Sequence, residues 1–149
     1  ILGKSLSGGV YPISGVLTKS EIMDVLTPGT HGSTYGGNPL ACAISMEAVN
    51  VIFEEDLINN SYKMGKYFRD ELNKLKLKNV TDIRGKGLLN AIEFNNKRNA
   101  NKGLKNLKNN GLLTNIKKDK ILRFTPPLII NKNQLDNALE IIESSLNYD

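Results

Sequence analysis

Lys4 is the first residue whose type and surroundings could support chemistry, because a loop rich in glycine and serine follows it. Its small neighbours leave room for a flat ligand, and a lysine amine can form a Schiff base with a carbonyl group. The Gly-Lys-Ser sequence also resembles a nucleotide-binding loop, but that motif needs a helix starting at the lysine. Ser7, Gly8, Gly9 and Pro12 are expected to prevent this helix. An exposed lysine without a catalytic role is the alternative.

Residues 31–39 could receive a phosphate group. Ser33 and Thr34 place two hydroxyls among several glycines, just before Asn38 and Pro39, which are typical of a helix start. Hydroxyls and backbone amides in front of a helix are a common setting for phosphate binding. A glycine-rich turn with an ordinary cap is the alternative, and it does not explain the density of glycine, serine and threonine.

Two arginines could bind a carboxylate, because a guanidinium offers a planar pair of hydrogen-bond donors. Arg84 lies beside glycines, between two expected strands, and Arg123 lies in the strand expected before Pro126-Pro127. For each of them, a surface arginine of a β-hairpin is the alternative interpretation.

The composition limits other functions. The 149 residues have a formal net charge of +5, and the basic excess is concentrated in residues 97–120, where no aromatic residue interleaves the charges. A solvated helix face is therefore favoured over a nucleic-acid surface. His31 and Cys42 are the only residues of their types, so neither a metal site nor a disulfide is expected. No apolar run approaches the roughly 18 residues that a membrane helix requires.

These candidate residues depend on a small number of expected elements. Residues 1–18 are expected to form a tight loop that leads into a short strand at Val16-Leu17, and residues 20–26 a short helix. Helices are expected from Pro39 to about Glu54 and from Leu57 to Leu75. Strands are expected at residues 80–83, 87–94, 112–115 and 121–124, with a helix at 102–110 that ends at Gly111. A last amphipathic helix has expected core positions at Leu135, Ala138, Leu139, Ile142 and Leu146.

The ordered set of motifs resembles the class III pyridoxal 5'-phosphate (PLP) aminotransferases, and within them the ornithine aminotransferases. The resembling segments are residues 2–12, 31–41, 84–91 and 123–128. The Gly-Lys loop and the Gly-Gly-Asn-Pro-Leu helix start are shared across class III. The ornithine type is indicated by Tyr11-Pro12 and by residues 32–35 and 85–90.

The resemblance implies an α/β PLP-dependent transferase fold of type I. Residues 1–57 are then the C-terminal part of the large PLP-binding domain, and residues 58–149 a small α+β C-terminal domain. It implies that Lys4 forms the Schiff base with PLP and moves a proton between substrate and cofactor. Ser33 and Thr34 match residues that reach the PLP phosphate of a neighbouring subunit, which implies a homodimer. Arg84 matches the arginine that receives a substrate carboxylate.

The implied reaction transfers the δ-amino group of ornithine to 2-oxoglutarate and gives glutamate semialdehyde and glutamate. Another class III donor, acetylornithine or γ-aminobutyrate, is an alternative, as is a non-catalytic basic interaction module. The resemblance also implies an aspartate for the pyridine nitrogen and a phosphate loop before Ile1, so this segment alone is not expected to transaminate. Cytoplasm is the expected location, with the mitochondrial matrix as the alternative, and neither nucleic acid nor membrane is an expected partner.

Overall fold

The computed structural model describes residues 1–147, and the chain divides into two compact units. The first unit ends at Asp56 and the second begins at Leu57. This division lies one residue before the expected boundary between residues 57 and 58. The assignment of the two units to a large cofactor domain and a small domain stays a prediction.

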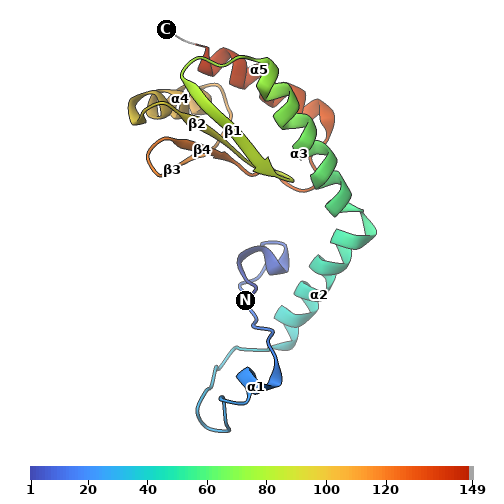
Figure 1. Ribbon diagram of the computed structural model, residues 1–149. Helices are drawn as coiled ribbons and strands as arrows, with labels where there is room; N and C mark the ends of the chain where they lie inside the picture. Colours follow the sequence, from blue (N-terminus) through green and yellow to red (C-terminus); the bar gives the residue numbers. More distant parts are fainter. Residues whose placement is uncertain (148–149) are drawn as a thin grey trace. The chain divides into compact units, whose positions relative to one another are not determined.

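The first unit is built around the Lys4 loop and helix α2 (Pro39–Glu54). A single 3-10 turn, η1 (Lys4–Ser7), and the short helix α1 (Ser20–Met23) precede α2 (Figure 1). Leu2 and Gly15 exchange two backbone hydrogen bonds of 2.8 and 3.0 Å, which close the loop that contains Lys4. Helix α2 begins where its sequence predicts, because Asn38 caps it and Pro39 occupies the first helical position.

Two expectations for the first unit are wrong. Val16 and Leu17 form no strand, since the only β pairing within residues 1–56 is the isolated Leu2–Gly15 bridge, and both side chains are exposed. A short apolar run cannot form a strand when no neighbouring strand satisfies its backbone groups. The helix expected over residues 20–26 is also shorter than predicted, because α1 ends at Met23. At Lys4, by contrast, no longer helix forms, as expected: a single 3-10 turn ends at Gly8, whose φ is 65°.

The second unit is an antiparallel sheet with three helices on one face (Figure 1). The strand order is β1-β2-β4-β3, with bounds β1 (Val80–Lys86), β2 (Leu89–Phe94), β3 (Asn115–Lys117) and β4 (Ile121–Phe124). The helices are α3 (Leu57–Lys74), α4 (Lys97–Asn109) and α5 (Lys132–Leu146). None of the helices in residues 1–147 is both long and apolar enough to cross a membrane.

Alternation along β2 and β4 separates the two faces of the sheet. Ile92, Phe94, Leu122 and Phe124 are buried on the helix side, while the residues between them are only partly covered. Phe124 meets Phe68 of α3 edge to face, with ring centroids 5.9 Å apart. The uncovered face therefore carries the side chains that alternate with this core.

The expected helices and strands of the second unit are found, with three shifted starts. Strand β2 begins at Leu89 and not at residue 87, because Gly87, with a φ of 52°, lies in the turn before it. Helix α4 begins at Lys97 and not at residue 102, because the Asn96 side chain accepts a hydrogen bond of 2.9 Å from Asn99 N and caps the helix. Strand β3 begins at Asn115, at the end of the expected range 112–115. In α5, the expected core positions Leu135, Leu139, Ile142 and Leu146 are buried.

Helix α3 and the β1–β2 turn approach one another without intervening side chains. A Cβ atom built on Gly65 would lie 1.8 Å from the carbonyl oxygen of Gly87. Arg69, one turn further along α3, donates hydrogen bonds to Gly87 O at 2.8 Å and to Asn90 Oδ1 at 2.6 Å. The turn is therefore fixed to the helix by backbone contact and by one arginine.

Candidate functional site

A cavity of about 540 Å³ lies beside Lys4 in the first unit. Its walls combine the Lys4 loop with the start of helix α2, two segments that were singled out separately from the sequence. The lining residues are Lys4, Pro12, Ile13, Ser14, Ser33, Tyr35, Gly36, Gly37, Asn38 and Ala41. This volume is within the range of pockets that hold small ligands and cofactors.

Lys4 has a backbone conformation that is unusual for its residue type. Its φ is 55°, in the left-handed region, which costs a non-glycine residue roughly 1–2 kcal/mol. The surrounding loop holds it there, since the buried Ser7 hydroxyl donates to Tyr11 O and accepts a hydrogen bond of 3.1 Å from Tyr11 N. Residues held in strained conformations by their surroundings cluster at functional sites.

The segment before α2 is ordered by its own hydrogen bonds. Ser33 Oγ accepts a hydrogen bond of 2.9 Å from Gly36 N, and Asn38 Oδ1 accepts one of 2.9 Å from Ala41 N. Because a serine hydroxyl has one donor and two acceptor positions, Ser33 keeps its O–H group for another partner. Ser33 lines the cavity beside Lys4, whereas Thr34 is exposed and does not.

Both candidate arginines project from the uncovered face of the sheet in the second unit. Arg84 is paired with Ala91, Ala91 with Arg123, and Arg123 with Asn115, so these four residues form one row across the strands. Directly paired residues of an antiparallel sheet point to the same face. The row was missed at the sequence level, because no local pattern shows that β4 lies next to β2.

Arg84 is already engaged by carboxylates. Its guanidinium forms ion pairs with Asp82 and, at 2.8 Å, with Glu93. Hydrogen bonds from Lys120, and then from Arg84, hold the pKa of Glu93 below its usual value. A substrate carboxylate would have to displace these partners, so the predicted role of Arg84 stays a prediction.

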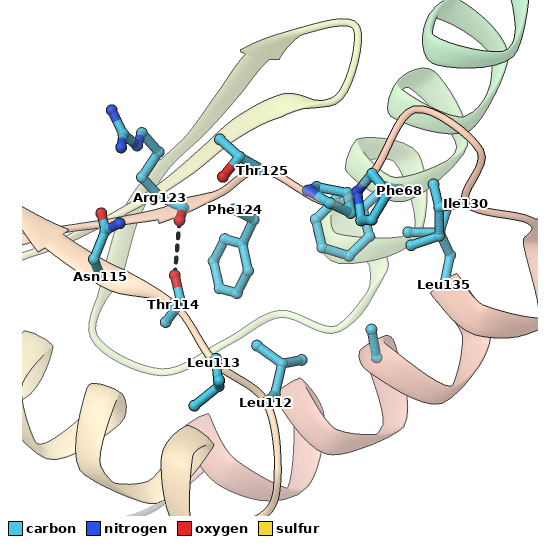
Figure 2. Close-up of a pocket in the computed structure, with 13 residues that line it drawn as sticks. Phe68, Leu112, Leu113, Thr114, Asn115, Arg123, Phe124, Thr125, Ile130 and Leu135 are labelled. Carbon is cyan, nitrogen blue, oxygen red and sulfur yellow. Dashed lines mark hydrogen bonds between the residues drawn. The ribbon is translucent and has the colours of Figure 1, made fainter. Parts of the chain in front are cut away.

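Arg123 lies at a second cavity, of about 400 Å³ (Figure 2). Its Nε atom is buried and has no hydrogen-bond partner within the described residues. Its backbone is fixed, because the Thr114 hydroxyl donates a hydrogen bond of 2.8 Å to Arg123 O, drawn dashed in Figure 2. Phe124 and Leu112 supply apolar parts of the cavity wall. Figure 2 shows the guanidinium itself directed away from these apolar residues, on the uncovered face of the sheet. A guanidinium without a counter-charge is suited to receive an anion there.

The basic stretch at residues 97–120 is divided between helix α4 and the β3–β4 hairpin. Its one acidic residue, Asp119, forms an ion pair of 3.1 Å with Lys97. The lysines of α4 are exposed, while Ala100 and Leu107 face the core. This arrangement agrees with a solvated helix face. Within residues 1–147, no group of three or more His, Cys, Asp or Glu side chains is arranged to hold a metal ion.

The chain is similar to known proteins over almost all of its length. The family model for class-III aminotransferases matches residues 1–146. Ornithine aminotransferase of Staphylococcus epidermidis is 49% identical over 144 residues, which are 97% of this chain and 36% of that protein. The mitochondrial ornithine aminotransferase of Drosophila melanogaster is 49% identical over 146 residues, 98% of this chain and 34% of that protein.

Solved structures share the fold. The ornithine aminotransferase of Toxoplasma gondii superposes with a TM-score of 0.91 at 44% identity, covering 97% of this chain and 35% of that one. An acetylornithine aminotransferase from Elizabethkingia anophelis gives a TM-score of 0.90 at 48% identity, covering 97% and 39%. The chain thus spans little more than a third of the length of these relatives.

Proposed function

The chain belongs to the class-III aminotransferase family, and from this premise we propose that it carries the reactive lysine and the substrate-binding arginine of a PLP-dependent ornithine aminotransferase. The observation that carries the proposal is the cavity that joins Lys4 to Ser33 and the glycines before helix α2. The proposed reaction moves the δ-amino group of ornithine to 2-oxoglutarate.

The residues around the Lys4 cavity fit PLP in both size and chemistry. The cofactor has an aldehyde, which requires an amine, and a phosphate, which requires hydrogen-bond donors. Lys4 supplies the amine at this cavity. The proposed donors for its phosphate are Ser33 and Thr34 of the neighbouring subunit in a homodimer. When bound, PLP supplies an electron sink for the charge that develops at the substrate carbon.

The chain's own residues then have distinct roles. The Lys4 amine would take a proton from the amine-bearing carbon of the substrate and deliver it to the cofactor, which is general acid–base catalysis. Ser33 and Thr34 hold a phosphate group, and in a homodimer they would serve the neighbouring subunit. The lone exposed Cys42 suits a reducing location, with cytoplasm proposed and mitochondrial matrix the alternative.

For the substrate carboxylate, the geometry favours Arg123 over Arg84. Both lie in the same row of the sheet, but Arg84 already has two carboxylate partners and Arg123 has none within residues 1–147. Replacing Arg123 by alanine removes a charged hydrogen bond worth about 1.5–3 kcal/mol. We therefore expect the KM for 2-oxoglutarate to rise by roughly 10- to 150-fold in the Arg123→Ala full-length protein.

The matched variant Arg84→Ala tests the alternative. It is expected to leave this KM close to the wild-type value, because the Arg84 guanidinium is already held by Asp82 and Glu93 and, on this proposal, does not contact the substrate. Steady-state kinetics of both variants and the wild type, with 2-oxoglutarate varied at saturating ornithine, provide the measurement. A large rise for Arg84→Ala alongside a small one for Arg123→Ala would instead support Arg84 as the carboxylate receptor.

The amino donor is tested by half-reactions. The full-length protein, loaded with PLP, is mixed separately with ornithine, acetylornithine and γ-aminobutyrate, and the loss of the cofactor's visible absorbance is followed. Ornithine is expected to react fastest. Acetylornithine is the second candidate, because the solved structure with 48% identity is described as an acetylornithine aminotransferase. A faster reaction with acetylornithine would reject the ornithine proposal and leave the family unchanged.

A further inference from the structure

We propose that Asn60 is a positioning residue: it holds the loop that follows β4 and thereby sets the position of Arg123. The inference rests on the proposed role of Arg123 in binding the substrate carboxylate. Asn60 does not line the Arg123 cavity, so any effect on binding must pass through the loop.

One side-chain amide holds two carbonyl groups of the same loop. Asn60 Nδ2, in the first turn of α3, donates hydrogen bonds to Leu128 O at 2.6 Å and to Ile130 O at 3.0 Å. These acceptors are 68 and 70 residues away along the chain. The contact is therefore tertiary, and it fixes the loop to a rigid helix.

The loop itself is poorly able to hold its shape by backbone hydrogen bonds. Pro126 and Pro127 have no amide hydrogen, although their rings restrict the backbone. Inside the loop, Ile130 N donates a hydrogen bond of 3.1 Å to Pro127 O. The bonds from Asn60 therefore supply an external anchor for a segment with few donors of its own.

The anchored loop is continuous with the strand that carries Arg123. β4 ends at Phe124, one residue after the arginine, and the loop begins at Thr125. Arg123, Thr125, Pro126, Pro127 and Ile130 all line the same cavity of about 400 Å³. A displacement of the loop changes both the wall of this cavity and the end of the short strand. The position of the guanidinium then depends on the anchor.

The first turn of α3 also holds a second connecting segment of the sheet, the β1–β2 turn. Ser61 Oγ, next to Asn60, accepts a hydrogen bond of 3.2 Å from Leu88 N in the β1–β2 turn. Two adjacent side chains thus tie the β1–β2 turn and the loop after β4 to one turn of one helix. Loss of the Asn60 bonds would release one of these segments and leave the other anchored.

The test uses the full-length protein and glutarate, a dicarboxylate that cannot accept an amino group. Asn60→Ala is compared with Asn73→Ala, a control on the same helix whose exposed side chain donates only to Arg69 O, at 2.8 Å. Calorimetric titration gives the glutarate Kd, kinetics give kcat and KM, and hydrogen exchange reports on the amide of Ile130. Asn60→Ser, which keeps one donor, replaces the alanine variant if that variant does not fold.

We expect Asn60→Ala to weaken glutarate binding and raise the KM for 2-oxoglutarate by about tenfold, with kcat changed less than about threefold and Ile130 exchanging faster. Asn60→Ser should weaken binding by a smaller factor, and Asn73→Ala should match the wild type.

Wild-type glutarate affinity in both Asn60 variants overturns the inference, as does an equal loss in Asn73→Ala. If Arg123→Ala binds glutarate normally, the premise fails and so does the inference. If the wild type does not turn over ornithine, only the proposed function is overturned, because the glutarate Kd of the Asn60 variants still tests whether Asn60 positions Arg123.

Discussion

Replacement of Lys4 by alanine is expected to lower the transamination rate by roughly 10³-fold or more, because the amine that moves the proton is lost. The same variant should no longer retain PLP covalently after borohydride reduction, which mass spectrometry of the Lys4 peptide can follow. Compared in the absence of PLP, its melting temperature should remain close to that of the wild type. Alanine and lysine experience a similar strain at a φ of 55°, so the substitution does not change the backbone cost.

Lys19→Ala provides the matched control for this prediction. Lys19 is an exposed lysine of the same unit, directly before helix α1, and it does not line the Lys4 cavity. It should keep both activity and borohydride-fixed PLP. If the Lys4→Ala protein still retained covalently fixed PLP, another lysine would be the reactive one and the assignment of Lys4 would be wrong.

Replacement of Gly65 by alanine is expected to destabilise the second unit by about 2 kcal/mol or more, as overpacking against a rigid neighbour does. The added Cβ would lie 1.8 Å from Gly87 O, and this neighbour is backbone, which cannot rotate away. Arg69 also holds the same carbonyl, so the turn cannot retreat without losing that bond. Thermal and denaturant unfolding of the full-length protein provide the measurement.

Gly103→Ala separates this clash from the helix propensity of alanine. Both glycines are buried in helices, and each substitution should gain about 1 kcal/mol of helix propensity. At Gly103 the nearest atoms to an added Cβ belong to side chains, Leu146 Cδ2 at 2.9 Å and Phe94 Cζ at 3.2 Å. Its stability should stay within about 1 kcal/mol of the wild type. Equal stability of the two variants would show that the turn moves away from α3 at little cost.

Local signals predicted much of the fold because they act over a few residues. Asn38 and Pro39 determine the start of α2 through one side-chain bond and one missing amide hydrogen. The apolar periodicity of α5 identified its buried side, and β4 has the bounds that its pattern predicts. The class-III fold followed from the order of the motifs along the chain, each of which is also local in sequence.

The features that local signals missed depend on distant parts of the chain. The run Val16-Leu17 has the composition of a strand, but within residues 1–147 no strand pairs with it. The row that contains Arg84 and Arg123 exists only because β4 lies next to β2. The start of α4 at Lys97 depended on which of several asparagines forms the cap, and the composition alone does not distinguish Asn96 from the others.

The candidate site likewise combines residues that the sequence indicated with arrangements that only the fold shows. The residue types of Lys4 and Ser33 indicated their chemistry, but only the fold brings both to one cavity. The two arginines had similar local settings, and the partners that distinguish them, Asp82 and Glu93 at Arg84, lie on two strands. Asn60 gave no signal at all, because its acceptors are 68 and 70 residues away.

The side-chain hydrogen bonds of helix α3 also bear on the order of folding, because they close loops of very different lengths. The bond from Arg69 to Gly87 spans 18 residues and that from Leu88 to Ser61 spans 27, whereas the bond from Asn60 to Leu128 spans 68. Short closures cost less entropy and form earlier during folding. We therefore expect the β1–β2 turn to dock on α3 before the loop after β4 does. We also expect the Asn60 bonds to form after the transition state, so that Asn60→Ala speeds unfolding and leaves the folding rate unchanged, which stopped-flow folding and unfolding kinetics can measure.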